Sequence, residues 1–461
     1  MTPTPEQQKR LRRRPLGRYR YTRLRWRVVF ALVDWVGAWL FALGRALRRW
    51  LGKDEPTEPP AEPEIVLLVQ LDHLGDAILT TSMLPWLRRQ YPSASIEVLA
   101  SPWNCEVFDA AVEVDRVHVF RWNRFARGVL LPLVWVPAMV WQGWRLRRRR
   151  IGLAVDVRGD CSIALMLWIA GVKRRVGWSA GGGGFLLTES AAFVPNRPEL
   201  ESRRALLETL GIQLGRQPRM RPRFHPSPWA RRQIRGWLTT WLRQAEKLCD
   251  ESKADSNVVI ALRTTSNHHT PCDDRGVSPS EAVSTRPLVV LHIGAGTAAK
   301  QWPVEHWREL LGRLVVDRQA RVVLVGNTRE KRLARQILEG RRWPGVLDGT
   351  GWLSLDELAA LIELADLFAG ADSGPAHLAA SVDTPVVALF SGTNHAEQWR
   401  PVGRQVVVLR EPVACSPCHR ETCCWGEHPC MRNLSPQRVA SEVAAMMEAT
   451  ALSPNTERNP T

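Results

Sequence analysis

Short apolar runs rich in Val, Ile and Leu recur along most of the chain and alternate with longer stretches of helical period. Such runs predict strands of a parallel sheet, because helices cover both faces of that sheet. The predicted strands are residues 65–70, 96–100, 117–120, 153–157, 288–293, 322–325, 367–369 and 385–390. Helical patterns follow at 77–89 and, with a capping serine, at 354–365. The alternation indicates βαβ units and an α/β fold.

Two further apolar segments are rich in tryptophan and adjoin arginine clusters. Residues 28–43 contain Trp35, Trp39 and Asp34 and are shorter than the roughly 20 residues of a comfortable membrane span. We therefore expect this segment to lie on a membrane, with a span as the alternative. Residues 129–144 could dip into the interface or form a core helix with a solvated basic end. A signal peptide is not expected, because the basic stretch before residue 28 is long.

Length and charge agree with a two-domain protein that has an anionic partner. The chain has 461 residues, too many for one ordinary core, and a net charge of +17 carried mostly by arginine. Its basic clusters adjoin apolar stretches rather than a recognised nucleic-acid-reading module, so we expect an anionic membrane surface and no nucleic acid. The Pro- and Glu-rich stretch 53–64 is a predicted linker, and the four glycines at 181–184 are expected to form a flexible loop without chemistry.

These composition shifts divide the chain into segments. A basic N-terminal segment with its linker occupies residues 1–60, and the first α/β domain covers 61–225. An interdomain linker or insertion follows at 226–286, and its residues 264–286 are expected to be exposed. The second α/β domain covers 287–445, and a tail takes 446–461.

A candidate phosphate site lies where residues 371–377 join an apolar run to an Ala-rich helical pattern. Asp372 or Ser373 can cap the helix, and Gly374 lets a ligand approach the backbone closely. Pro375 suits the first turn, so free N–H groups and the positive end of the helix dipole face an anion. His377 could add a donor. The alternative is an ordinary helix cap with a buried histidine.

Two other strand ends carry candidate chemistry. The run 288–293 breaks into a loop that contains Gly294 and reaches Lys300, which suits phosphate oxygens. The run 65–70 is followed by Asp72, Gly75 and Asp76 before a helical pattern, so carboxylates lie at a helix start. Loops at the carboxyl ends of parallel strands are where such sheets bind ligands.

Together these blocks resemble glycosyltransferase family 9, the lipopolysaccharide heptosyltransferases. The resemblance covers about residues 64–445 and not 1–60. Four blocks carry it, in the family's order and spacing: Gly75-Asp76 with Tyr91-Pro92, then 294–303, 353–377 and 415–431. It implies a GT-B-like fold, two facing Rossmann-like domains with parallel sheets and an active site in the cleft between them.

The resemblance also implies residue roles. Asp76 matches the catalytic aspartate, and its alternative is an N-cap. Gly75 and Asp72 would lie on the acceptor side. Donor binding would involve Gly294, Lys300, Asp372, Ser373, Gly374 and His377, without a divalent metal and with inversion at the sugar. Glu330 would contact the nucleoside, and its alternative is an exposed charge beside Lys331. His73 could serve loop packing or acceptor contact.

The implied reaction transfers a sugar, expected to be heptose from ADP-heptose, to a lipid-linked or core oligosaccharide at the cytoplasmic face of the inner membrane. Residues 1–60 depart from the family's usual start, so a different envelope glycan stays open. Two other functions remain as alternatives: a catalytically silent sugar-nucleotide-binding protein of the same fold, and a zinc-dependent interaction module.

The cysteines form one compact group within residues 415–430. Cys415, Cys418, Cys423 and Cys430, with Cys424 beside them, have spacing that permits a structural zinc, helped by His419 and His428. A structural role as thiols is the main prediction, since the resemblance implies that transfer requires no cofactor. The scattered cysteines Cys105, Cys161, Cys249 and Cys272 are expected to be inert.

Overall fold

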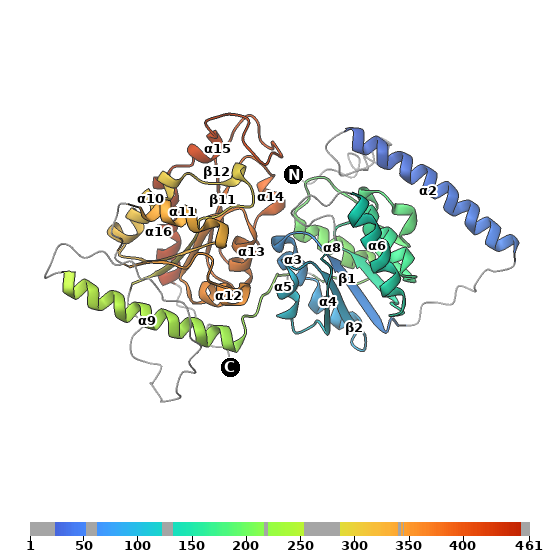
Figure 1. Cartoon of the computed structure of the whole chain (residues 1–461), viewed down its shortest axis with the longest axis horizontal. Coiled ribbons are helices and arrows are strands. Elements are labelled where there is room, and N and C mark those ends of the chain that lie inside the picture. Colours follow the sequence, from blue (N-terminus) through green and yellow to red (C-terminus); the bar gives the residue numbers. More distant parts are fainter. Residues whose placement is uncertain are drawn as a thin grey trace. The chain divides into compact units, whose positions relative to one another are not determined.

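The computed structural model of the chain describes residues 24–51, 62–121, 132–215, 220–252, 286–339, 343 and 345–452 (Figure 1). The chain divides into two compact units. The first comprises Met1–His225, Ala380–Val382 and His395–Gly403, and the second comprises Pro226–Ala379, Asp383–Asn394 and Arg404–Thr461. Each unit is an α/β body built on its own parallel sheet.

Among the described residues of the first unit, six parallel strands form a sheet of order β3-β2-β1-β4-β5-β6. They are β1 (Ile65–Gln70), β2 (Ser95–Ala100), β3 (Arg116–Val119), β4 (Leu153–Asp156), β5 (Arg174–Trp178) and β6 (Glu189–Ala191). The helices are α3 (Leu74–Thr81), α4 (Leu84–Gln90), α5 (Cys105–Asp109), α6 (Pro132–Arg147), α7 (Cys161–Ile169) and α8 (Glu199–Thr209). Strands β2 and β3 lie on one side of β1, and β4, β5 and β6 lie on the other. The strand order therefore reverses between β1 and β4.

The described part of the second unit repeats this plan, with a parallel sheet of order β12-β11-β10-β7-β8-β9. Its strands are β7 (Leu288–His292), β8 (Arg321–Val325), β9 (Val346–Asp348), β10 (Leu367–Ala371), β11 (Val386–Phe390) and β12 (Val406–Arg410). The helices are α9 (Pro228–Ser252), α10 (Val304–Gly312), α11 (Lys331–Leu338), α12 (Leu355–Leu364), α13 (Gly374–Ser381), α14 (Ala396–Trp399), α15 (Pro429–Arg432) and α16 (Pro436–Leu452), of which α14 belongs to the first unit. Strand order reverses here between β7 and β10.

The strand and fold-class predictions are confirmed, whereas the single helix predicted over 77–89 is wrong. The structure has two helices there, α3 and α4, which break at Ser82 and Met83. The hydroxyls of Thr81 and Ser82 donate to the carbonyls three residues earlier, at 2.7 and 2.6 Å. Helix α4 then begins at Leu84 with Pro85 in its first turn, where the N–H that proline lacks is not needed for a helical hydrogen bond.

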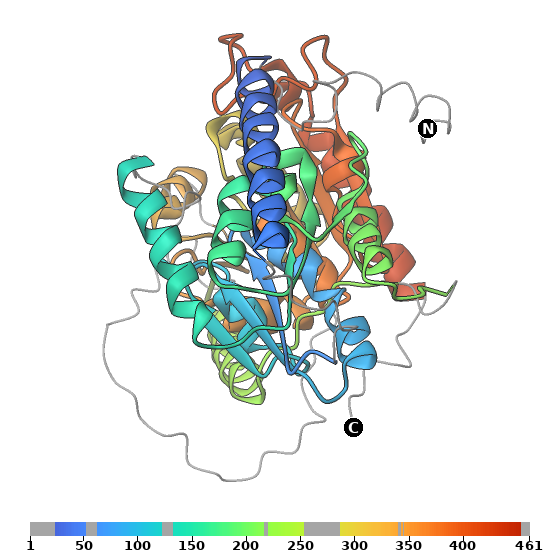
Figure 2. The same cartoon turned by 90° about the vertical axis from the view of Figure 1, so that its right-hand side faces the viewer.

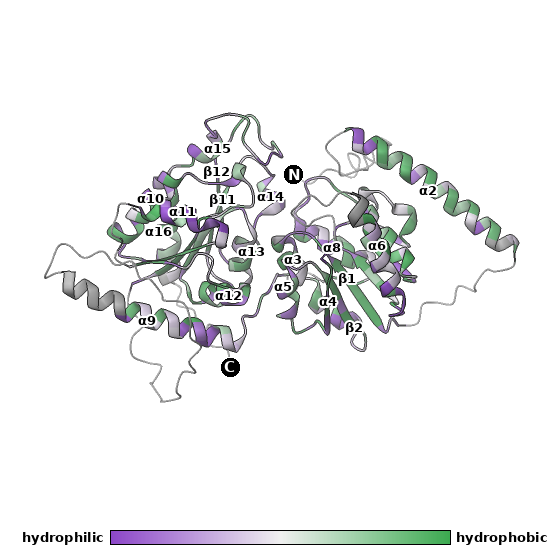
Figure 3. Cartoon of the chain, in the orientation of Figure 1, coloured by the Kyte–Doolittle hydropathy of each residue, from purple (hydrophilic) through white to green (hydrophobic). Residues whose placement is uncertain are grey.

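The N-terminal apolar segment is longer than its sequence pattern predicted. Helix α2 spans Leu24–Trp50 and includes the flanking arginines (Figure 3). Within the described part of the chain, one helix, over Leu24–Leu47, is long and apolar enough to cross a membrane by length and composition alone. Gly181, Gly182 and Gly183 are buried and Gly184 is half-buried, where the tight turns η1 (Ser179–Gly181) and η2 (Gly184–Leu186) meet, so the prediction of a flexible loop there is wrong.

The stretch 226–286, assigned from sequence to a linker or insertion, contains helix α9. This helix packs on α12, where Arg231 pairs with Glu363 at 2.7 Å and the Ser227 hydroxyl donates to Asp356 at 2.6 Å. Residues 253–285, with His268, lie outside the described residues, as do residues 1–23 of the N-terminal segment.

Candidate functional site

A buried cluster of charges lies at the carboxyl end of the first unit's sheet, at its reversal point. Asp72 follows β1 and is 1% exposed, and its carboxylate pairs with Arg158 at 3.1 Å. Arg158 follows the neighbouring strand β4. The Asp156 carboxylate, at the end of β4, accepts the backbone N–H groups of Arg158 and Gly159 at 3.0 and 2.8 Å. This loop therefore holds Arg158 against Asp72 where such sheets bind ligands.

Asp76 extends this cluster towards helix α8. It lies in the first turn of α3, is 4% exposed and pairs with Arg203 at 3.1 Å. Arg203, on α8, is 3% exposed and also pairs with Glu199. The N-cap residue of α3 is His73, so the N-cap alternative for Asp76 is wrong. The structure thus places the Asp76 carboxylate against a cationic partner, Arg203.

The electrostatics of the cluster act strongly on Asp72. Burial, and then repulsion from Asp76, raises the pKa of Asp72 to about 7, although Arg158 and Arg203 oppose this. Burial disfavours the charge of Arg203, yet Glu199, Asp76 and Asp72 together raise its pKa. Asp72 therefore titrates near neutrality inside a network that keeps its arginines charged.

Sequence reasoning found Asp72, Gly75 and Asp76 at this edge but missed Arg158 and Arg203. A signal for Arg158 was present, because it follows the strand next to β1 and a strand end at the reversal point is a binding position. Arg203 has no such signal. It comes from α8, and 127 residues separate it from Asp76.

The second unit has its own polar cluster at the reversal point between β7 and β10. The Lys300 ammonium, in the turn η3 (Ala298–Lys300), lies 2.6 Å from the Asp372 carboxylate that follows β10. The Asn394 amide donates to the same carboxylate oxygen at 3.2 Å. Asp372 is 6% exposed. The sequence-predicted pair Lys300 and Asp372 is thus brought together, with Asn394 as an additional partner that the sequence did not indicate.

The start of α13 adjoins this pair. Ser373 lies with its hydroxyl 3.3 Å from Nδ1 of His292, the last residue of β7, and α13 begins at Gly374 as predicted. Burial lowers the pKa of His292 to about 4, so the ring is neutral near pH 7. His377 is buried inside the same helix, 5% exposed. A lysine and a helix N-terminus therefore occur together, a combination that suits phosphate oxygens.

Gly294 and Glu330 also meet at this edge. A Cβ on Gly294 would lie 1.8 Å from the Glu330 carboxylate, so only glycine leaves room for that side chain. The Glu330 carboxylate accepts the Asn327 N–H at 2.7 Å in a capping box and lies 3.9 Å from Nε2 of His292. The Glu330 side chain is only 13% exposed, so the alternative of an exposed surface charge is wrong, and burial raises its pKa.

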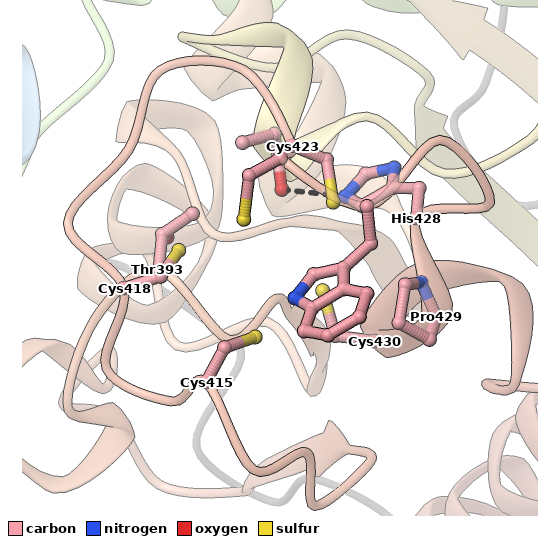
Figure 4. Close-up of a pocket in the computed structure, with 10 residues that line it drawn as sticks. Thr393, Cys415, Cys418, Cys423, His428, Pro429 and Cys430 are labelled. Carbon is pink, nitrogen blue, oxygen red and sulfur yellow. Dashed lines mark hydrogen bonds between the residues drawn. The ribbon is translucent and has the colours of Figure 1, made fainter.

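The cysteine-rich loop 415–430 lies beside the Lys300 turn. Figure 4 shows the side chains of Cys415, Cys418, Cys423 and Cys430 around one small cavity. The Ala299 N–H donates to the Glu421 carbonyl at 2.9 Å, and His428 Nε2 donates to the Ala299 carbonyl at 2.9 Å. The loop therefore braces the turn that carries Lys300, which gives it a structural role beside the second unit's polar cluster.

The thiols in this loop are close neighbours. Desolvation, and then the nearby thiol of Cys418, raises the pKa of Cys415. Cys430 is buried, whereas Cys424 is exposed. Across the described residues, no group of three or more His, Cys, Asp or Glu side chains is arranged to hold a metal ion.

Comparison with known proteins shows the family of this chain. The family model described as glycosyltransferase family 9 (heptosyltransferase) matches residues 142–428. The lipopolysaccharide heptosyltransferase 2 of Escherichia coli is 24% identical over 394 residues, which are 83% of this chain and 98% of that protein.

Solved structures show the same fold. The structure of E. coli ADP-heptose lipopolysaccharide heptosyltransferase II matches with a TM-score of 0.61 and 21% identity, covering 84% of this chain and 99% of that one. An E. coli heptosyltransferase with ADP-2-deoxy-2-fluoro heptose matches with a TM-score of 0.56 and 18% identity, covering 83% of this chain and 99% of that one. With two parallel-sheet units and GT-B heptosyltransferases as structural relatives, this glycosyltransferase belongs to glycosyltransferase family 9, the heptosyltransferases.

Proposed function

We propose that this glycosyltransferase moves heptose from ADP-heptose to a hydroxyl of a lipopolysaccharide-core or related envelope oligosaccharide, with inversion and without a metal. The observation that carries the proposal is the donor edge, where Lys300 and the N-terminus of α13 meet at a sheet reversal point. Family membership and the ADP-heptose analogue in a structural relative support ADP-heptose as the donor.

Asp76 is the proposed general base. Arg203 bonds to Oδ1 of Asp76, which leaves Oδ2 to accept the proton of the acceptor hydroxyl in this proposal. The departing diphosphate gains negative charge as the sugar bond breaks. Lys300 and the amide groups at the start of α13 would stabilise that charge. Inversion follows when a single displacement transfers the sugar directly to the activated hydroxyl.

The base assignment is tested with Asp76→Asn. This variant keeps the shape of the side chain but cannot accept the proton, so we expect kcat to fall about 10²- to 10⁴-fold. Donor binding should persist and is measured by thermal shift against a panel of nucleotide sugars, since ligand binding to the native state raises its stability. Transfer by the variant at the wild-type rate would contradict the assignment of Asp76.

Metal independence is tested by chelation. Lys300 and the α13 amides supply the positive charge that a divalent ion would otherwise bring to the diphosphate. We therefore expect transfer rates to be the same with excess EDTA and with added Mg²⁺. Loss of transfer in EDTA with recovery on adding the metal would contradict this part of the proposal. Elemental analysis of the purified protein decides separately whether the cysteine loop holds zinc.

A further inference from the structure

Helix α2 carries a large apolar surface that the transfer chemistry does not use. Over Leu24–Leu47 only 6% of the most apolar window is buried. Trp35 is 71% exposed and Trp39 61%, with Leu32, Leu40 and Leu43 all more than half exposed. Exposed apolar surfaces of this size mark binding surfaces in water-soluble proteins.

The opposite side of α2 packs against the α/β body of the first unit. Phe30, Asp34, Gly37 and Phe41 recur at helical spacing and form one stripe. Asp34, the acidic residue of this apolar helix, is 8% exposed, and its carboxylate accepts the Gly183 N–H at 2.6 Å. The buried carboxylate thus has a specific hydrogen-bond partner on the α/β body.

Glycines and aromatic rings make this contact close. A Cβ on Gly37 would lie 2.1 Å from the Phe185 ring, and one on Gly182, whose φ is +83°, would lie 2.4 Å from Phe30. Phe41 packs edge-on against Phe185 and Trp168, with ring centroids 6.1 and 6.0 Å apart. The four-glycine segment 181–184 therefore forms part of the surface on which α2 packs.

A docked α2 is inconsistent with a helix that crosses the bilayer. The stripe lies against η2 and the two glycines before it, Gly182 and Gly183, whose backbone groups would enter hydrocarbon together with the helix. Irregular, lipid-exposed backbone does not occur at that depth, because each unsatisfied polar group costs several kcal/mol there. Only the outer half of α2 is free to enter lipid, as in helices that lie in the plane of the interface.

Helix α6 contributes a second part of the same surface. Its Trp141 and Trp144 are 51% and 53% exposed, and the guanidinium groups of Arg145 and Arg148 lie 4.7 and 5.0 Å from their ring centroids. Helix α7 connects the two parts, because its Ile169 contacts α6 and its Trp168 contacts α2. Figure 2 shows α2 (blue) in the middle of the view and α6 (teal) at its left.

We propose that the outer faces of α2 and α6 form an in-plane binding surface for an anionic lipid bilayer. Tryptophan is favoured at the membrane–water interface, and arginine beside it complements anionic headgroups. Arg25, Arg27 and Arg45 flank the apolar window of α2, so charge and apolar surface coincide along one helix. This proposal goes beyond sugar transfer and holds independently of the donor.

The surface is tested by sedimentation of the full-length protein with vesicles. We expect binding to phosphatidylcholine vesicles that contain phosphatidylglycerol, weaker binding to phosphatidylcholine alone, and weakening by salt. Trp35→Asp with Trp39→Asp should lower the partition constant at least about tenfold, because interfacial binding scales with buried apolar area. The matched control is Val112→Asp with Trp229→Asp, since these side chains are 83% and 51% exposed on other segments. Equal losses in both double variants, or no vesicle binding by the wild type, would overturn the proposal.

The orientation of α2 has its own test. An epitope is added before Met1, and spheroplasts are treated with protease. An in-plane helix leaves the epitope protected until the cells are lysed, whereas a spanning helix exposes it and overturns the in-plane surface. If α2 instead mediated self-association, light scattering would show a lower molar mass for Trp35→Asp with Trp39→Asp than for the wild type. That result would also refute the lipid surface. Transfer to a soluble acceptor does not need the lipid surface, so this variant should transfer sugar at the wild-type rate. The transfer proposal is therefore tested separately from the lipid surface.

Discussion

Arg203→Met should destabilise the first unit strongly, because it removes the cation from a buried cluster of carboxylates. The side chains of Arg203 and Asp76 are 3% and 5% exposed, and Glu199 is 16% exposed. Methionine fills a similar volume but leaves both carboxylates without this partner. Breaking a buried pair in this way costs about 3–5 kcal/mol. For a unit of this size that corresponds to a Tm lower by about 10 °C, at roughly 2–4 °C per kcal/mol.

The same helix supplies the matched control. Arg204 is the next residue and also pairs with a glutamate, Glu208, at 3.0 Å, but the two side chains are 40% and 54% exposed. Exposed pairs contribute about 0–1 kcal/mol, so Arg204→Met should shift the Tm by no more than about 4 °C. Urea denaturation of the full chain measures the change in the free energy of unfolding for both variants. Hydrogen exchange of peptides from α3 and α8 assigns the loss to the first unit.

A double variant separates charge from packing. Adding Asp76→Asn to Arg203→Met removes one of the uncompensated charges, so about 1–3 kcal/mol should return. A loss caused only by packing would not be recovered. If Arg203→Met costs no more than Arg204→Met, or if the double variant recovers nothing, the description of a charge-compensated buried cluster is refuted.

Further predictions concern the donor edge and pH. Lys300→Met should raise the donor Kd about 10- to 100-fold in calorimetry, the range of one charged hydrogen bond, whereas exposed Lys331→Met should not. The native pKa of Asp72, raised from 3.8 to about 7, means that the native state holds a proton which the unfolded chain lacks between those values. Asp72 therefore lowers the stability of the native state as pH rises through that window. The Tm of Asp72→Asn should rise relative to that of the wild type from pH 5 to pH 8. Curves of Tm against pH that run parallel for the two proteins would contradict this. Gly294→Ala should destabilise by about 1–3 kcal/mol through its clash with Glu330, and Glu330→Ala should relieve that loss in urea denaturation.

Features encoded by neighbouring residues could be predicted from the sequence. The cap of α12 is one, since Ser354 and Glu357 form a capping box three residues apart. The positions of Asp72 and Lys300 are others, because each follows a buried strand whose end is visible in the hydropathy pattern. These signals depend on period and chain order alone.

Features that depend on tertiary partners could not be predicted. Arg203 lies on a helix next to Arg204, and nothing in that local pattern distinguishes the buried arginine from the exposed one. The extent of α2 was underestimated because the apolar pattern stops at the arginines, whereas a helix whose charged ends are exposed continues through them. Likewise Gly182 was assigned no role, because its constraint comes from Phe30, far away in the sequence.

The cysteine-lined cavity behind the Lys300 turn offers a route to inhibitors that do not resemble a nucleotide. The loop contacts that turn at both the N–H and the carbonyl of Ala299. A group added to a thiol of the cavity would lie close to the turn that carries Lys300, so we expect alkylation there to lower donor affinity. Such a compound would act beside the donor site rather than inside it, and because coupling between two sites is reciprocal, bound donor would in turn oppose the modification.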